Sequence, residues 1–438
     1  MSNNQKFFIL LSGWILIILS IGAKPPILFF DKNYFFQSLE SFRITFAIVI
    51  SFIFFLSFFF LYDVKKFTKL KFLFFFILYF TFQVIGLYQN KEANFNLDNL
   101  YLIVLSLGAI GIIYLALLTS KNKILEFFLY TLIAITFAIS IILLGKALVD
   151  EEFKTIYLYT VISPKKIIFE NTDLSYPRIT GIARSLAVAN ILIIIFFLKE
   201  KIFKYKIALI TVAVCIGIVI WSAQSRGAIL CYFSVLFTIL FLYREKKFLN
   251  KIIFFLLLFI LPIATLSIAN IFYKNIITTE DQFNSDGKRV PPIYETRFTQ
   301  LKFNNSGRTD LWSNSLTLYN KNKIFGYGPQ GDRFLLPLSG PEGFGNNVSN
   351  GYIYSFLSGG YPGLIIFLTI TINIFLVVCK NLFVTKIFIN NKNASIKIAT
   401  LILIFFLIRV LFENSYALFS IDFLLILISF FIAKDKKI

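Results

Sequence analysis

The chain has 438 residues, of which 58% are hydrophobic, and it contains 56 Phe against a single Met. So much apolar surface excludes an ordinary soluble domain and favours a membrane protein. The formal net charge of +20 does not indicate nucleic-acid binding, because the Lys and Arg residues gather in short loops between apolar segments. The absence of His excludes His-based acid–base chemistry and His metal sites, and the 3 Cys lie in apolar segments without disulfide or metal spacing.

Long apolar segments predict membrane-spanning helices, since a span needs about 17–25 mostly apolar residues, and about twelve segments qualify. Their cores are Phe7–Ala23, Phe42–Leu61, Phe72–Tyr88, Leu100–Leu118, Leu125–Leu144, Ile182–Leu198, Ile207–Ser222, Ala228–Tyr243, Ile252–Tyr273, Tyr352–Cys379, Ile398–Phe412 and Tyr416–Ala433. We therefore expect an all-α, polytopic membrane protein.

Positive charge recurs in every second loop and predicts the orientation. The clusters are Lys65–Lys71, Lys121–Lys123, Lys199–Lys206, Arg244–Lys251, Lys380–Lys397 and Lys434–Lys437. The positive-inside rule places these loops and both termini in the cytoplasm. Residues 1–273 then hold nine spans with a short non-cytoplasmic loop at 146–181, residues 274–350 form a large non-cytoplasmic loop, and residues 351–438 hold three spans.

The large loop contains a predicted amphipathic helix at Thr309–Asn320. Its apolar side recurs at helical spacing, Ser306 or Thr309 can cap its start, and Asp310 is favourable in the first turn. We expect this helix to lie on the membrane surface with Trp312 at the interface. The glycines that follow, in IFGYGPQG, permit tight turns and close approach of backbone.

Four arginines on or near the non-cytoplasmic side stand out: Arg178, Arg226, Arg308 and Arg409. Arginine within or beside a membrane bundle is costly and marks a candidate site, and its planar fork suits pyrophosphate. Alternatively, each side chain reaches the lipid headgroups or pairs with a local carboxylate. Glu413 follows Arg409 by about one helical turn and is its expected partner, whereas Asp422 lies in the last span and needs a partner.

Five short sequences, in this order, resemble the superfamily of O-antigen ligases and O-antigen polymerases, which are bacterial membrane glycosyltransferases. They are RITGIARSLAVAN, SAQSRGAIL, GRTDLWSNSL followed by IFGYGPQG, NVSNGYIYSFLSGGYPGLIIF and RVLFENSYALFSIDF. The resemblance covers residues from about Arg178 to Asp422.

This resemblance implies a fold like that of glycosyltransferases of the C type and an inverting, metal-independent transfer outside the inner membrane. It implies no cofactor and a glycan on undecaprenyl pyrophosphate as donor. Ligases transfer the glycan to the lipid A core, and polymerases transfer it to another lipid-linked repeat unit. Arg226 and Arg308 occupy positions where the family places arginines that contact pyrophosphate.

The chain departs from the ligases at Ser349-Asn350, where ligases carry His-Asn. Serine cannot accept a proton at neutral pH as imidazole can, which favours a polymerase. The general base stays open between Glu413 and Asp310, which join Arg226 and Arg308 as catalytic candidates. The substrate-binding candidates are Arg178, Arg409, Ser349, Asn350, Trp312 and Tyr352.

Expected partners are the lipid-linked oligosaccharide, membrane lipids and a chain-length regulator. The rival functions are a flippase for the same glycan and a structural subunit without chemistry. A flippase favours broken helices near the midplane and internal pseudosymmetry, whereas the polar residues here concentrate in one loop.

Overall fold

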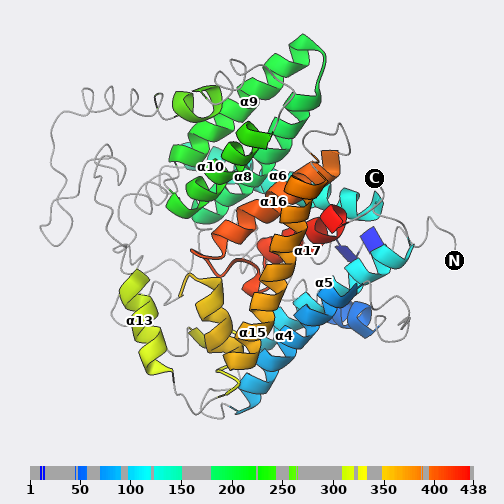
Figure 1. Ribbon diagram of the computed structural model, residues 1–438, viewed down its shortest axis with the longest axis vertical. Helices are drawn as coiled ribbons and strands as arrows, with labels where there is room; N and C mark the ends of the chain where they lie inside the picture. The colour runs from blue at the N-terminus through cyan, green and yellow to red at the C-terminus, as the bar shows by residue number, and fades with distance from the viewer. Residues whose placement is uncertain are drawn as a thin grey trace, which may run out of the picture.

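Every regular element in the part of the chain that the computed structural model describes is a helix (Figure 1). The described residues are 10–11, 13–14, 45, 48–56, 70–89, 97–119, 123–149, 179–222, 225–242, 256–262, 264, 308–319, 324–332, 348–385, 387 and 394–434. The helices are α4 (Lys71–Gln89), α5 (Leu97–Thr119), α6 (Lys123–Val149), α8 (Ile179–Lys199), α9 (Phe203–Ser222), α10 (Arg226–Leu242), α13 (Arg308–Leu318), α15 (Gly351–Cys379), α16 (Ala394–Arg409) and α17 (Ile421–Lys434). Three short turns complete them: π-helical η3 (Leu256–Ile260) and η4 (Lys380–Val384), and the 3₁₀ turn η5 (Ser415–Ala417).

Five of these helices are long and apolar enough to cross a membrane by length and composition. Their spanning windows are Lys71–Tyr88, Lys123–Ile142, Gly181–Lys199, Phe203–Trp221 and Gly351–Val384. Shorter apolar helices occupy Leu102–Leu118 and Gly227–Phe241. The chain is thus a multi-pass membrane protein built from helices, as its composition predicts. The predicted spans Phe7–Ala23 and Ile252–Tyr273 fall mostly outside the described residues, and Phe42–Leu61 falls outside them in part.

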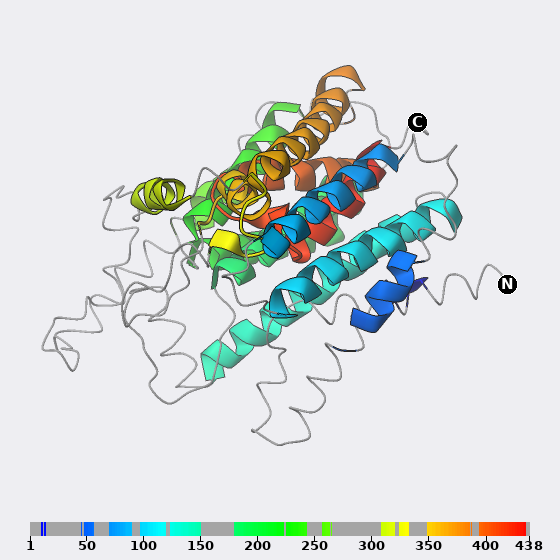
Figure 2. The ribbon, with the colours of Figure 1, turned by 90° about the horizontal axis from the view of Figure 1, so that it is seen from below.

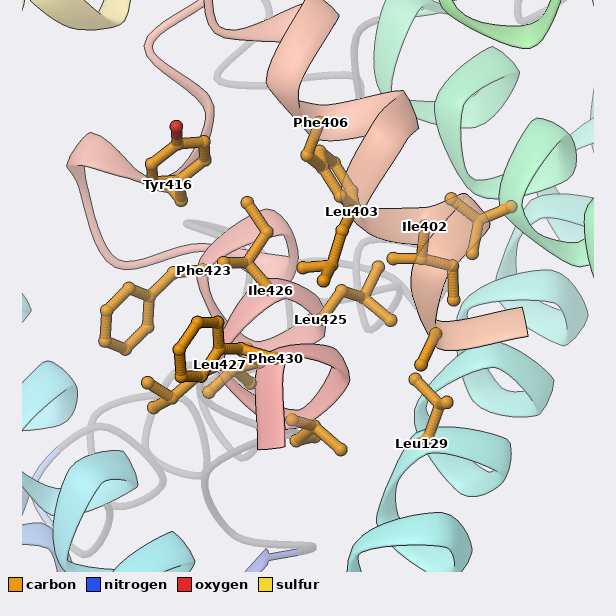
Figure 3. Packing of buried hydrophobic residues seen from close by; sticks show 14 of the residues in the cluster. Leu129, Ile402, Leu403, Phe406, Tyr416, Phe423, Leu425, Ile426, Leu427 and Phe430 are labelled. Atoms are coloured by element: carbon orange, nitrogen blue, oxygen red, sulfur yellow. The ribbon is translucent and has the colours of Figure 1, made fainter. Parts of the chain in front are cut away.

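The centre of the bundle is α17, in which every residue from Asp422 to Ala433 is buried. A helix that is apolar on all sides is expected where other helices surround it, and α17 contacts α6, α15 and α16. Figure 3 shows Leu425 of α17 on the side that faces Ile402 and Leu403 of α16 and Leu129 of α6. Phe72 of α4 stacks on Phe430 with 3.5 Å between ring centroids. Close packing of this kind holds membrane helices together where lipid offers no hydrophobic driving force.

One end of the bundle gathers the starts of α8, α10, α15 and α17 and the end of α16, and we call it the Arg409 end. The Gly351 N–H, at the start of α15, donates to the Val410 carbonyl at 2.8 Å. At the other end, Asn381 beyond α15 donates to the Ala433 carbonyl near the end of α17 at 3.0 Å. The helices lie side by side in Figure 2. Because α8 starts at the Arg409 end, the Lys-rich turn Lys199–Lys206 that follows it lies away from that end. Which of the two ends faces the cytoplasm stays a prediction from the charged loops.

Candidate functional site

Helix α15 is broken at Gly360, where the backbone takes φ 65° and ψ −159°. Pro362 has no N–H, so the Ser358 carbonyl lacks its usual donor four residues on. The Leu357 carbonyl also loses its helical donor, because the Tyr361 N–H points to the Ile324 carbonyl instead, at 3.1 Å. A break inside a membrane protein must satisfy these backbone groups in some other way.

The segment 324–332 closes this break. Its Tyr327 N–H donates to the Leu357 carbonyl at 2.8 Å, and its Gly328 N–H donates to the Ser358 carbonyl at 2.9 Å. Two glycines make the approach possible: a Cβ on Gly360 would overlap the Ile324 carbonyl, and one on Gly86 of α4 would overlap the Phe325 carbonyl. The loop is therefore held between α4 and the broken turn of α15, at a fixed position beside the Arg409 end.

A buried carboxylate, Asp332, ends this segment and links it to two others. Its Oδ2 accepts the Val348 N–H at 3.2 Å and the Asn414 side-chain amide at 3.4 Å. The Asn414 Oδ1 in turn accepts the Asn350 N–H at 3.2 Å. We call Asp332, Asn350 and Asn414 the Asp332 network. It joins the loop, the entry to α15 and the turn between α16 and α17.

Asn350 caps α15. Its side-chain oxygen accepts the N–H groups of Tyr352 and Ile353 at 2.9 and 3.1 Å, and its amide donates to the Leu411 carbonyl at 3.1 Å. These bonds satisfy backbone donors that a helix start leaves open. Asn350, which the sequence predicts to bind substrate, therefore stabilises the start of α15. The ring of Tyr352, another predicted substrate-binding residue, packs edge-on against Phe367 with 5.7 Å between ring centroids.

A second carboxylate, Asp422 at the start of α17, pairs with two arginines. Its Oδ1 lies 2.9 Å from Nη1 of Arg184, and its Oδ2 lies 3.2 Å from Nε of Arg409. The Ser415 hydroxyl donates to the same Oδ2 at 3.3 Å. Asp422 and Arg409 are buried, so each needs the other to offset the cost of leaving water. The ion pair shown for Arg409 is thus with Asp422, and the half-buried Glu413 lies in the turn that follows.

The predicted loop helix exists as α13, Arg308–Leu318, and it lies beside the first half of α15 (Figure 1). Trp312 donates its indole N–H to the Val348 carbonyl at 2.7 Å, which ties α13 to the entry of α15. Tyr319, just after the helix, packs against Phe356 with 4.3 Å between centroids. Burial, with the nearby Tyr361 and Tyr327, raises the pKa of Tyr319 to about 12, so the phenol stays protonated at neutral pH.

The two arginines predicted to hold pyrophosphate begin helices: Arg226 is the first residue of α10, and Arg308 is the first residue of α13. Gly227 lies against Phe412, so the start of α10 adjoins the turn between α16 and α17. The side chains of Arg226, Arg308 and Asp310 lie outside the described part of the structure, and so does the whole of Arg178. Backbone positions therefore bring α10, α13, the α15 entry and Arg409 to one end of the bundle.

Three participants were not singled out from sequence: Arg184, Asp332 and Asn414. The sequence could have identified Arg184, because an arginine inside an apolar helical segment needs a partner for its charge. The sequence could not identify Asp332 and Asn414, since each is an ordinary polar residue between helices. Their side chains are hydrogen-bonded although they are separated by 82 positions in the sequence. Only the folding of the loop onto the broken helix brings them together.

The comparison with known proteins bears on this same region. No curated protein matches the chain. Residues 210–368 match the model of a family described as O-antigen ligase. The matched stretch includes Arg226, Arg308, the Gly-rich loop, Ser349-Asn350 and the broken turn of α15. By this match to an O-antigen ligase family domain at residues 210–368, the predicted resemblance of the chain to the O-antigen ligase and polymerase superfamily is confirmed.

Proposed function

We propose that this protein is an O-antigen or related polysaccharide polymerase of the bacterial inner membrane. It transfers a glycan from undecaprenyl pyrophosphate to another lipid-linked repeat unit on the periplasmic side. The observation that carries the proposal is the family match over residues 210–368, which spans the helix starts with Arg226 and Arg308 and the entry to α15. A chain-length regulator is a candidate partner, and no cofactor is required.

The reaction is a substitution at the anomeric carbon. A hydroxyl oxygen of the acceptor sugar forms the new C–O bond from the opposite face, the bond to undecaprenyl pyrophosphate breaks, and the configuration inverts. The hydroxyl proton passes to a base, for which Glu413 and Asp310 are the candidates. Negative charge grows on the leaving pyrophosphate, and Arg226 and Arg308 stabilise it without a metal ion by charge-assisted hydrogen bonds.

Polymerase is preferred to ligase because Ser349 stands where ligases carry His, so the imidazole base is absent. The ligase remains the alternative, since the matching family is described as O-antigen ligase. A flippase is the second alternative, and the break in α15 is the feature that favours it, because transporters use broken helices to bind their cargo. Here, however, backbone N–H groups of Tyr327 and Gly328 occupy the two carbonyls at the break. This occupancy supports an enzyme with a fixed loop.

The test uses purified protein with an undecaprenyl-pyrophosphate-linked repeat unit as the only substrate. Wild-type protein should form lipid-linked polymer. Arg226→Ala and Arg308→Ala should each lower the rate by about 10²–10³-fold, the usual effect of removing one stabilising donor. Arg→Lys at either position should restore little, because a point charge lacks the planar fork.

Thr317→Ala, on the exposed face of α13, is the control and should keep the wild-type rate. Normal polymer from both Arg→Ala variants would remove these residues from the mechanism. Wild-type protein that moves the substrate across a vesicle bilayer without forming polymer would identify a flippase instead.

A further inference from the structure

Strained backbone is concentrated around the Asp332 network. Among the described residues other than glycine, positive φ occurs at Gln330 (59°), Ser349 (48°) and Ser415 (37°). Such conformations are sparsely populated, persist only where their surroundings impose them, and cluster at functional sites. Gln330 lies two residues before Asp332, Ser349 directly before Asn350, and Ser415 directly after Asn414. All three strained residues therefore lie within two residues of a member of one hydrogen-bonded network.

Ser349 is held on both sides. The N–H of Val348 donates to Asp332 at 3.2 Å, and the Val348 carbonyl accepts the Trp312 indole N–H at 2.7 Å. On the other side, the N–H of Asn350 donates to Asn414 at 3.2 Å. Val348 and Asn350 are buried, whereas Ser349 between them is partly exposed. The strained residue is thus presented at the surface of the Arg409 end by two anchored neighbours.

Asp332 is the member that fixes both anchors. The residue is 1% exposed, and the same carboxylate oxygen that accepts the Val348 N–H also accepts from Asn414. Asn414 in turn accepts the Asn350 N–H. Removing this carboxylate would take away one hydrogen bond from Val348 and the one that holds the Asn414 side chain, and so would weaken the hold on both flanks of Ser349 together.

We propose that Asp332 is a positioning residue of the glycan transfer. It holds the turn at Ser349 in its left-handed conformation, and so fixes the wall of the site that α15 places beside the starts of α10 and α13. Asp332 does not touch the reacting atoms. This inference rests on the proposed function, and it assigns to Ser349 a role of backbone shape, with little contribution from its hydroxyl.

The first test separates turnover from substrate binding with purified protein. Asp332→Ala should lower kcat for polymer formation by about tenfold or more, because small displacements of a site wall strongly affect rate. The KM for the lipid-linked repeat unit should stay within about twofold, since Arg226 and Arg308 are unchanged. Asp332→Asn should retain most of the activity, because its amide oxygen can still accept from Val348 and Asn414.

A matched control loosens the same loop elsewhere. Tyr354→Phe removes the hydroxyl that accepts the Gln330 N–H at 3.0 Å, and so takes one hydrogen bond from another strained residue without touching those of Val348 and Asn350. Its kcat should stay within about twofold of wild type. A twofold change in rate corresponds to less than half the change in activation free energy that a tenfold change requires. If Tyr354→Phe lowers kcat as far as Asp332→Ala does, the effect is general loosening, and the proposal is wrong.

The second test uses the conformational preference of glycine. Gly adopts positive φ readily and Ala does not. If Asp332 acts by imposing that conformation, Asp332→Ala should cost less activity in a Ser349→Gly background than in a Ser349→Ala background. Ser349→Ala alone should retain substantial activity. Equal losses in the two backgrounds would show that Asp332 does not act through the turn at Ser349.

A third measurement keeps this inference distinct from the proposed function. Hydrogen exchange of the peptide covering residues 348–353 should be faster in Asp332→Ala than in wild type, while α16 keeps its protection, whatever reaction the protein performs. Unchanged exchange would overturn the structural role. Wild-type protein that forms no polymer would reject the proposed function and the catalytic role together. An active wild type with an equally active Asp332→Ala would reject this inference alone.

Discussion

At the scale of single residues, Asp422 balances two buried arginines, and this arrangement predicts an order of stabilities. Asp422→Asn leaves Arg184 and Arg409 without their carboxylate, whereas Arg184→Met or Arg409→Met leaves Asp422 with one arginine. Breaking a buried pair from one side costs about 3–5 kcal/mol. Asp422→Asn should therefore be the least stable of the three variants, as measured by thermal unfolding of the purified protein in detergent.

The arginine variants serve as the comparison for that experiment. Each should unfold at a temperature between those of Asp422→Asn and wild type. If Arg409→Met is as unstable as Asp422→Asn, Arg184 contributes nothing to the pairing, and the three-residue interpretation fails. Sequence alone indicated that Asp422 needs a partner, but it could not choose among arginines from four segments, because that choice depends on how α8, α16 and α17 pack.

At the scale of elements, the joint between α15 and the segment 324–332 predicts opposite effects for two adjacent glycines. A Cβ at Gly360 would overlap the Ile324 carbonyl in a backbone conformation of φ 65°, whereas a Cβ at Gly359 would lie 3.7 Å from Gln83, an ordinary contact. Gly360→Ala should displace the loop and speed hydrogen exchange at Tyr327 and Gly328. Gly359→Ala should leave that exchange unchanged. Equal hydrogen exchange in both variants would contradict the close contact between α15 and the segment 324–332.

The elements also show what sequence could and could not predict. Apolar length located α4, α5, α6, α8, α9 and α10, and helical spacing located α13, because one side of a membrane or surface helix must be apolar along its length. The span Tyr352–Cys379 was expected to be continuous, although the sequence Gly359-Gly360-Tyr361-Pro362 carries the ordinary signals of a break. The local sequence around this break could not predict that the segment 324–332 supplies the missing hydrogen bonds.

For the whole molecule, alternating helices bring the candidate site to one end and Lys-rich turns to the other. This arrangement suits a substrate whose lipid tail lies in the bilayer and whose glycan lies outside it. Arg226 and Arg308 reach this end as the first residues of two different helices, α10 and α13. The sequence predicted their sidedness from charge, whereas their grouping with Asp332, Asn414 and Arg409 required the fold.

Deletion of the gene in its own cell tests the central claim, polymerase activity, most directly. The measurement is the glycan pattern on the lipid A core. Without a polymerase, a separate ligase still caps the core, so the account predicts cores carrying single repeat units, with long chains restored by the wild-type gene and not by Arg226→Ala. Bare core together with polymer accumulated on undecaprenyl pyrophosphate would contradict it and would identify a ligase that works without His.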